Sequence, residues 1–322
     1  MQTPKSFLKL TDLTPGQLGE LLENSWSMKH RRGREATGAL CGQTWALLFH
    51  KSSTRTRVSF EVGIHELGGY PMVLDQARMQ TGRGETVEDT AKVLSRYIHG
   101  IIIRTYDHAF LETFAEAGSI PVINALTDSL HPCQVLSDLY TLSERWGSRG
   151  QLLSSLAGRK VVFMGDCASN MAHSWILGGA LARMKVVLCG PETFAPKPFV
   201  DDLLQKAGLP SSYHFTSDPS GALAGADAVY TDVWVSMGDE DEQEGRVKEL
   251  KPYQVNGTVM GMAKKEACFL HCLPAHEEEE VSTEVYRGPA SIVFDQAENR
   301  LHAQKAVLSM LARQTQQSQE IP

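Results

Sequence analysis

Short apolar runs that alternate with helix-like segments constrain this chain more than any other feature of its sequence. The runs consist almost continuously of Val, Ile, Leu and Phe, which is typical of parallel strands buried on both faces. We expect strands at 44–49, 71–74, 101–105, 122–125, 160–164, 185–189, 228–232 and 268–273. Because strands and helices alternate in both halves, the predicted fold class is α/β, with two doubly wound parallel-sheet domains.

The expected helices lie between these strands and after the last one. They span 54–67, 86–97, 108–117, 132–146, 170–183, 198–207 and 297–312. Thr86 and Asp89 form a capping pattern, and Pro132 stands at a first helical position, where proline is tolerated. The small and polar stretch 147–158 is interpreted as a linker, and 322 residues are enough for two domains of ~150 residues each.

The charge balance excludes some classes of function. The formal net charge is -7, which argues against a nucleic-acid or anionic-membrane binder. The first residues contain no apolar signal segment, and no apolar run approaches a membrane span, so we expect a soluble, cytoplasmic protein. The six cysteines are scattered without a C-x-x-C pair, so disulfides are not expected.

An anion site is predicted directly after the first strand. The segment Lys51-Ser52-Ser53-Thr54-Arg55-Thr56-Arg57 places hydroxyls and an arginine where a helix begins, and free N–H groups, the helix dipole and a guanidinium together attract phosphate. Arg55 and Arg57 point in roughly opposite directions, so we take Arg55 as the ligand and Arg57 as structural. The simpler alternative is a helix cap with solvated arginines.

Two further groups after neighbouring strands favour the anion site. Arg104 ends one strand, and His131-Pro132-Cys133-Gln134 follows another and opens a helix. A phosphate site with a second arginine and a histidine suits a phosphorylated carbonyl compound, because the histidine can bind a carbonyl oxygen that gains charge. Taken alone, His131 is more often a cap or a core histidine.

The second half carries polar residues at equivalent places. Gly165–Asn170 follows a strand but lacks the G-x-G-x-x-G spacing, so nicotinamide binding is disfavoured. Asp232 ends another strand and can bind an ammonium group or cap a turn. His271, Cys272 and His276 raise a zinc alternative, which lacks a fourth ligand nearby, and a nucleophilic cysteine is also conceivable.

S-T-R-T-R at 53–57 followed by H-P-x-Q at 131–134 resembles the signature of the aspartate/ornithine carbamoyltransferase family. The likeness runs from about Phe7 to Leu311. It implies a carbamoyl-phosphate-binding domain at 1–146, an ornithine-binding domain at 151–296, and a C-terminal helix at 297–314 that returns to the first domain. It also implies a homotrimer or a multiple of trimers, with no metal and no cofactor.

The resemblance assigns roles to individual residues. The implied carbamoyl-phosphate ligands are Ser53, Thr54, Arg55, Thr56, Gln80, Arg104, His131, Gln134, Cys272, Leu273 and Arg300. Arg104, His131, Thr56 and Cys272 would be catalytic. The implied ornithine ligands are Asn170, Asp232, Ser236 and Met237, of which the last three belong to a D-x-x-x-S-M-G element that separates ornithine from aspartate enzymes.

The expected function is therefore transfer of a carbamoyl group from carbamoyl phosphate to L-ornithine, giving L-citrulline and phosphate in arginine metabolism. Two rivals remain, namely a sister enzyme acting on putrescine or an N-acylated ornithine and a silent paralogue that only binds ligand. The sequence departs from the family at His50, Met79, Ser169 and Glu277. The acidic run Glu277–Glu280 is interpreted as a solvated face.

Overall fold

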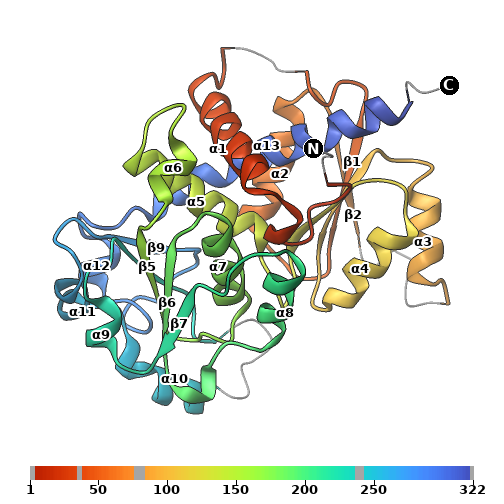
Figure 1. The fold of residues 1–322 in the computed structure, drawn as a ribbon. Coiled ribbons are helices and arrows are strands. Elements are labelled where there is room, and N and C mark those ends of the chain that lie inside the picture. Colours follow the sequence, from red (N-terminus) through yellow and green to blue (C-terminus); the bar gives the residue numbers. More distant parts are fainter. Residues whose placement is uncertain (1–3, 35–37, 76–83, 236–242, 320–322) are drawn as a thin grey trace. The chain divides into compact units, whose positions relative to one another are not determined.

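The fold is that of a computed structural model, which describes residues 4–34, 38–75, 84–235 and 243–319. The chain divides into two compact units, one of Met1–Leu152 with Asn299–Pro322 and one of Leu153–Glu298 (Figure 1). No helix among the described residues is long and apolar enough to cross a membrane.

The first unit is built on a four-stranded parallel sheet in the order β2-β1-β3-β4. Its elements are η1 (Leu10–Asp12), α1 (Pro15–His30), β1 (Thr44–Phe49), α2 (Thr54–Glu66), β2 (Tyr70–Leu74), α3 (Val87–Leu94), β3 (Gly100–Arg104), α4 (His108–Ala117), β4 (Val122–Leu126) and α5 (Pro132–Trp146). Every residue of β3 and β4 is buried, as expected of strands covered on both faces.

The edge strand β2 departs from that expectation. Tyr70, Met72 and Val73 are exposed, although the sequence pattern predicted a strand buried on both faces. A strand at the edge of a sheet has a neighbouring strand on one side only. Its apolar side chains therefore stay exposed unless another surface packs against them.

The second unit holds a five-stranded parallel sheet in the order β7-β6-β5-β8-β9. Its elements are β5 (Lys160–Met164), α7 (Asn170–Leu181), β6 (Lys185–Cys189), η3 (Glu192–Phe194), α8 (Phe199–Lys206), β7 (Tyr213–Thr216), α9 (Pro219–Leu223), β8 (Ala228–Thr231), α10 (Gln243–Leu250), η5 (Lys251–Tyr253), α11 (Gly257–Met262), β9 (Cys268–His271) and α12 (Thr283–Tyr286). Its core includes Val162, Val229 and Phe269 from three adjacent strands.

Two helices contain the chain positions at which one unit ends and the other begins. The short α6 spans Leu152–Leu156, and the long α13 spans Val293–Gln319, so that its first turns belong to the second unit and the rest to the first. The sequence pattern predicted a start for this last helix at 297. It did not predict α1, β7 or the short helices α6, α9, α10, α11 and α12.

Both sheets are doubly wound, as predicted, and strand order fixes where a ligand can bind. In the first unit the order reverses between β1 and β3, and in the second unit between β5 and β8. Ligands of open α/β sheets bind outside the carboxyl ends of the strands at such switch points. The loops after these four strands are therefore the places to look for chemistry.

Candidate active site

The loop after β1 forms the start of α2. Ser53 is the N-cap residue, and its Oγ accepts a hydrogen bond from the Thr56 N–H at 3.3 Å. Thr54 and Arg55 are exposed in the first turn, beside the N–H groups that a helix start leaves unpaired. Arg57 is instead held by Glu61 at 2.6 Å on the helix surface, in accord with the structural role predicted for it.

Arg300 joins the loop after β1 to the start of α5. Its Nη2 donates to Thr56 Oγ1 at 2.8 Å, and its Nη1 donates to Gln134 Oε1 at 2.7 Å. The amide nitrogen of Gln134 in turn donates to Asp138 at 2.9 Å. All four side chains are buried, so this network is rigid and well suited to hold one ligand geometry.

The Thr56 hydroxyl is oriented by this network. Its oxygen accepts from Ser53 Oγ at 2.9 Å as well as from Arg300. With both lone pairs occupied, what Thr56 offers a ligand is its proton. This geometry suits a donor to an oxyanion.

Arg104 and His131 lie at the ends of two buried elements of the same unit. Arg104 ends β3, where it is paired in register with Phe49 at the end of β1, and His131 is the N-cap residue of α5. Burial holds the pKa of His131 well below its ordinary value of 6.5, and the nearby Arg300 and Arg104 lower it further. His131 is therefore a neutral imidazole that can donate one N–H to a carbonyl oxygen.

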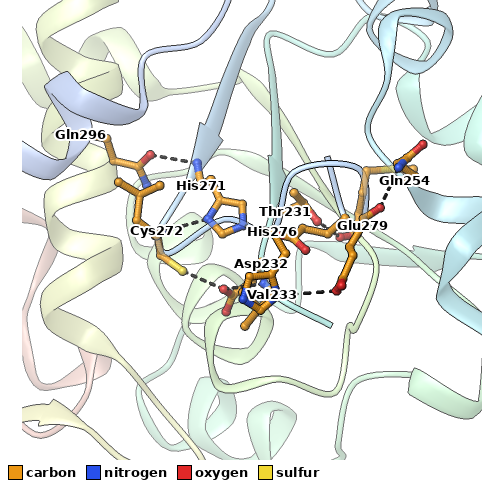
Figure 2. Close-up of polar contacts among 12 residues, drawn as sticks. Thr231, Asp232, Val233, Gln254, His271, Cys272, His276, Glu279 and Gln296 are labelled. Atoms are coloured by element: carbon orange, nitrogen blue, oxygen red, sulfur yellow. Dashed lines mark hydrogen bonds and ion pairs between the residues drawn. The ribbon is translucent and has the colours of Figure 1, made fainter. Parts of the chain in front are cut away.

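In the second unit, the ends of β8 and β9 bring Asp232 and Cys272 together. The Cys272 thiol donates to Asp232 Oδ1 at 2.8 Å, and the Val233 N–H donates to the same oxygen at 2.8 Å (Figure 2). Both side chains are partly buried. A carboxylate held in this way is ready to bind an ammonium group.

The loop after β5 supplies the neighbouring group. Ser169 caps α7, and Asn170 is the first residue of that helix, so its amide lies at the carboxyl edge of the strand next to β8. Asp166 in the same loop accepts from Arg246 Nη2 at 2.5 Å. Burial raises the pKa of Asp166 above its ordinary value despite this guanidinium.

The segment after β9 is organised by His271. The Leu273 N–H donates to His271 Nδ1 at 2.9 Å, so the other ring nitrogen, Nε2, carries the proton and donates to Glu280 at 3.1 Å. The His271 N–H donates to Gln296 Oε1 at 3.0 Å. Leu273 has φ +61, so this histidine supports a left-handed residue next to Cys272.

The acidic run at 277–280 is the solvated face that the sequence suggested only in part, because Glu277, Glu278 and Glu279 are exposed or partly exposed and Glu280 is not. Glu280 is completely buried, and its Oε1 accepts from both His271 Nε2 and the His276 N–H. Glu277 is paired with Arg287, and Glu278 accepts from the Thr283 N–H at 2.8 Å. The interpretation was wrong for Glu280 because consecutive residues of a tight loop face different surroundings, and this one packs against His271 at the end of β9.

A metal would have to compete with these hydrogen bonds. The ligand atoms of Asp232, His271 and Cys272 lie within 4.8 Å of one another. Both ring nitrogens of His271 are nevertheless engaged, one by the Leu273 N–H and one by Glu280. The donor set therefore fits a positioning role for His271 better than a metal centre.

The structure thus gathers the predicted residues into two sets, one in each unit. Ser53, Thr54, Arg55, Thr56, Arg104, His131, Gln134 and Arg300 belong to the first, and Asn170, Asp232, Cys272 and Leu273 to the second. Gln80, Ser236 and Met237 lie outside the described residues. The sequence analysis did not predict that Glu280 and Gln296 bind His271 or that Arg246 binds Asp166. The sequence signal for these contacts was that the three residues follow β8 or β9 in the chain.

Comparison with known proteins agrees with this arrangement. The family model described as aspartate/ornithine carbamoyltransferase, carbamoyl-P binding domain, matches residues 5–144, and the one described as the Asp/Orn binding domain matches residues 157–311. The chain belongs to the aspartate/ornithine carbamoyltransferase family.

Individual members of the carbamoyltransferase family resemble the chain over almost its whole length. The ornithine carbamoyltransferase of Clavibacter sepedonicus is 48% identical over 97% of this chain and 99% of the relative, and that of Staphylothermus marinus is 45% identical over 95% and 97%. Among solved structures, the ornithine carbamoyltransferase from Pyrococcus furiosus has a TM-score of 0.88 at 42% identity, covering 97% of this chain and 98% of the other.

Proposed function

We propose that this chain is an ornithine carbamoyltransferase, which converts carbamoyl phosphate and L-ornithine into L-citrulline and phosphate. The observation that carries the proposal is Asp232, held by Cys272 and the Val233 N–H at the carboxyl end of β8. When the side-chain amine of ornithine reacts, its α-ammonium keeps its charge and needs a carboxylate partner. An aspartate acceptor would instead bring two carboxylates toward Asp232.

The proposed roles of the carbamoyl-phosphate ligands follow the family resemblance, and the hydrogen bonds within the first unit support them. Ser53, Thr54, Arg55 and the helix N–H groups bind the phosphate, together with Gln80 of the loop outside the described residues. Arg104, neutral His131 and Thr56 donate to the carbamoyl oxygen, and Gln134 holds the carbamoyl group with help from Arg300 and the Leu273 carbonyl. Loss of one oxyanion donor costs about 10²–10³ in turnover in comparable enzymes.

The reaction needs no covalent intermediate. The neutral amine of ornithine attacks the carbamoyl carbon and forms the new C–N bond, while Asn170, Asp232, Ser236 and Met237 hold the amino acid and Cys272 contacts the attacking amine. The C–O bond to phosphate breaks, and its electron pair leaves with the phosphate against Arg55. The proton that the attacking amine loses is taken up by the departing phosphate. The donors of the site supply the required electrostatic stabilisation without a metal or cofactor.

The working form is proposed to be a cytoplasmic homotrimer or a multiple of trimers, acting in arginine metabolism. The support in this chain is a set of exposed large apolar side chains in the first unit, namely Val58, Tyr70, Met72, Val73, Val93 and Tyr97. Exposed apolar side chains are typical of surfaces that bind another copy when they gather in one patch. Light scattering should give three times 35.5 kDa, or a multiple of that mass.

The test of the activity is citrulline formation from carbamoyl phosphate, with L-ornithine, putrescine, N-acetylornithine and L-aspartate offered separately. We expect strong turnover with ornithine alone. Preference for another amine would refute the argument from Asp232, and no turnover with any acceptor would favour a silent paralogue. An Arg55→Ala variant with wild-type turnover at low carbamoyl phosphate would refute the phosphate site.

A further inference from the structure

His50 joins the loop after β1 to the end of β3, and the proposed reaction assigns it no role. It follows β1 directly and is one of the positions at which the sequence departs from the carbamoyltransferase family. Its N–H donates to the Arg104 carbonyl at 2.8 Å, and its ring Nδ1 is hydrogen-bonded to Thr105 Oγ1 at 2.9 Å. The ring is thus attached to the residue next to Arg104, which is proposed to bind the carbamoyl oxygen.

Both partners of this ring hydrogen bond are held by further contacts. The His50 ring is partly buried and lies edge-on to the Phe110 ring of α4, with the two centroids 5.1 Å apart. Thr105 is 3% exposed, and its N–H donates to the Leu126 carbonyl at the end of β4 at 3.0 Å. The hydrogen bond between His50 and Thr105 therefore joins a packed ring to a buried residue that is also attached to β4.

The sheet is irregular at Arg104, which makes the contacts on the β1 side important. The register between β3 and β4 shifts between Ile103 and Arg104, so that one residue of β4 is passed over. Such a bulge disrupts the ladder on that side and changes the direction in which a side chain points. On the other side, the pairing with β1 stays regular as far as Phe49 and Arg104, and His50 continues it. The direction of Arg104 therefore depends on what holds it from the β1 side.

We propose that His50 is a positioning residue for carbamoyl transfer, because its ring fixes Thr105 and thereby the direction of the Arg104 side chain. The inference rests on the proposed function, in which Arg104 donates to the carbamoyl oxygen. A displaced donor stabilises the developing charge less, since hydrogen bonds weaken steeply with poor geometry. His50 acts through Arg104, so its loss should lower kcat and leave the KM for ornithine nearly unchanged, because the proposed ornithine ligands lie in the second unit.

The experiment compares the steady-state turnover of His50→Ala with that of the wild type. We expect kcat to fall roughly tenfold, which is less than the 10²–10³ lost when an oxyanion donor is removed. The KM for ornithine should stay within about twofold of wild type. The peptide N–H of residue 50 remains in this variant, so the loss reports on the ring alone. His50→Asn, whose side-chain amide can still bind Thr105, should recover most of the lost turnover.

A second background separates positioning from a general loss of stability. With Arg104→Ala already present, the His50 ring has no guanidinium to position. Adding His50→Ala to that variant should therefore leave the remaining kcat within about twofold. A purely structural role would instead lower kcat by the same factor in both backgrounds.

The matched control is His108→Ala. His108 also belongs to the first unit, and its Nδ1 is hydrogen-bonded to Thr127 Oγ1 at the same distance of 2.9 Å. Its loss should lower Tm as the loss of His50 does, but it should leave kcat within about twofold. The inference is overturned if His50→Ala keeps wild-type kcat, if His108→Ala lowers kcat equally, or if the loss persists in full in the Arg104→Ala background. A wild-type chain without turnover would instead overturn the proposed function, and this inference with it.

Discussion

At the scale of single residues, Arg300 shows how a side chain distant in sequence completes a site. It reaches Thr56 at 2.8 Å and Gln134 at 2.7 Å, which are 244 and 166 positions away in the sequence. The same guanidinium also lowers the pKa of His131, after burial, which has the larger effect. One arginine thereby orients two candidate ligands and helps burial to keep a third neutral.

The neutral state of His131 predicts a pH dependence of stability. Its pKa is depressed in the folded chain, so its contribution to stability is fully present above the unfolded value of about 6.5. That contribution is lost as pH falls below 6.5, because only the unfolded chain then takes up a proton. Between pH 7.5 and 5, the free energy of unfolding measured in urea should fall less steeply with decreasing pH in His131→Gln than in the wild type. The two slopes should differ by up to about 1.4 kcal/mol per pH unit.

The exposed His214 provides the control for this measurement. His214→Gln should reproduce the wild-type slope. If the free energy of unfolding depended on pH identically in the wild type, His131→Gln and His214→Gln, His131 would not be held neutral by its surroundings.

Cys272 predicts a larger effect on the acceptor than on carbamoyl phosphate. Cys272→Ala removes the hydrogen bond to Asp232 and the proposed contact to the attacking amine, so kcat/KM for ornithine should fall by roughly 10–100-fold. The KM for carbamoyl phosphate should change much less. Cys41→Ser, at an exposed cysteine, should behave as wild type, and an equal loss there would point to a general effect of removing thiols.

At the scale of elements, hydrogen bonds through His271 hold the segment after β9 in place. His271 holds the Leu273 N–H, and Glu280 and Gln296 hold His271. A left-handed leucine costs of order 1–3 kcal/mol and persists only where its surroundings determine it. The position of Cys272 therefore depends on residues that contact no substrate.

Glu280 is the sharpest test of that support. Glu280→Ala leaves the His271 Nε2–H and the His276 N–H buried or partly buried without an acceptor, which costs about 1–3 kcal/mol for each unsatisfied group. A fall in Tm should therefore accompany a fall in kcat. Glu279→Ala, at the half-exposed neighbour, should change both only slightly. Equal effects of the two substitutions would mean that the run is a solvated face after all.

How much of this could be predicted from the sequence depends on the range of the interactions. Thr44–Phe49, Lys160–Met164 and Lys185–Cys189 match the predicted strands because their continuous apolar runs carry a strong local signal. β7 was missed because Tyr-His-Phe-Thr is a short, half-polar edge strand. The burial of Glu280 could not be foreseen, since its partner His271 is fixed by packing and not by sequence spacing.

At the scale of the whole molecule, the two sets of candidate ligands lie on separate compact units. Thr56, Gln134 and Arg300 are already joined by hydrogen bonds within the first unit. The Asp232–Cys272 pair belongs to the second. Both of these Arg300 hydrogen bonds join residues of the first unit.

This division predicts that carbamoyl phosphate binds without ornithine. By calorimetry, Asp232→Ala should leave the Kd of carbamoyl phosphate within about twofold of wild type, whereas Arg300→Ala should raise it at least tenfold, because a buried charge-assisted pair of hydrogen bonds is lost. In steady-state assays Asp232→Ala should instead raise the KM for ornithine, since the α-ammonium loses its carboxylate. Asp232→Ala could instead weaken the binding of carbamoyl phosphate as strongly as Arg300→Ala does. In that case the two substrates would share one set of ligands, and the assignment of one substrate to each unit would fail.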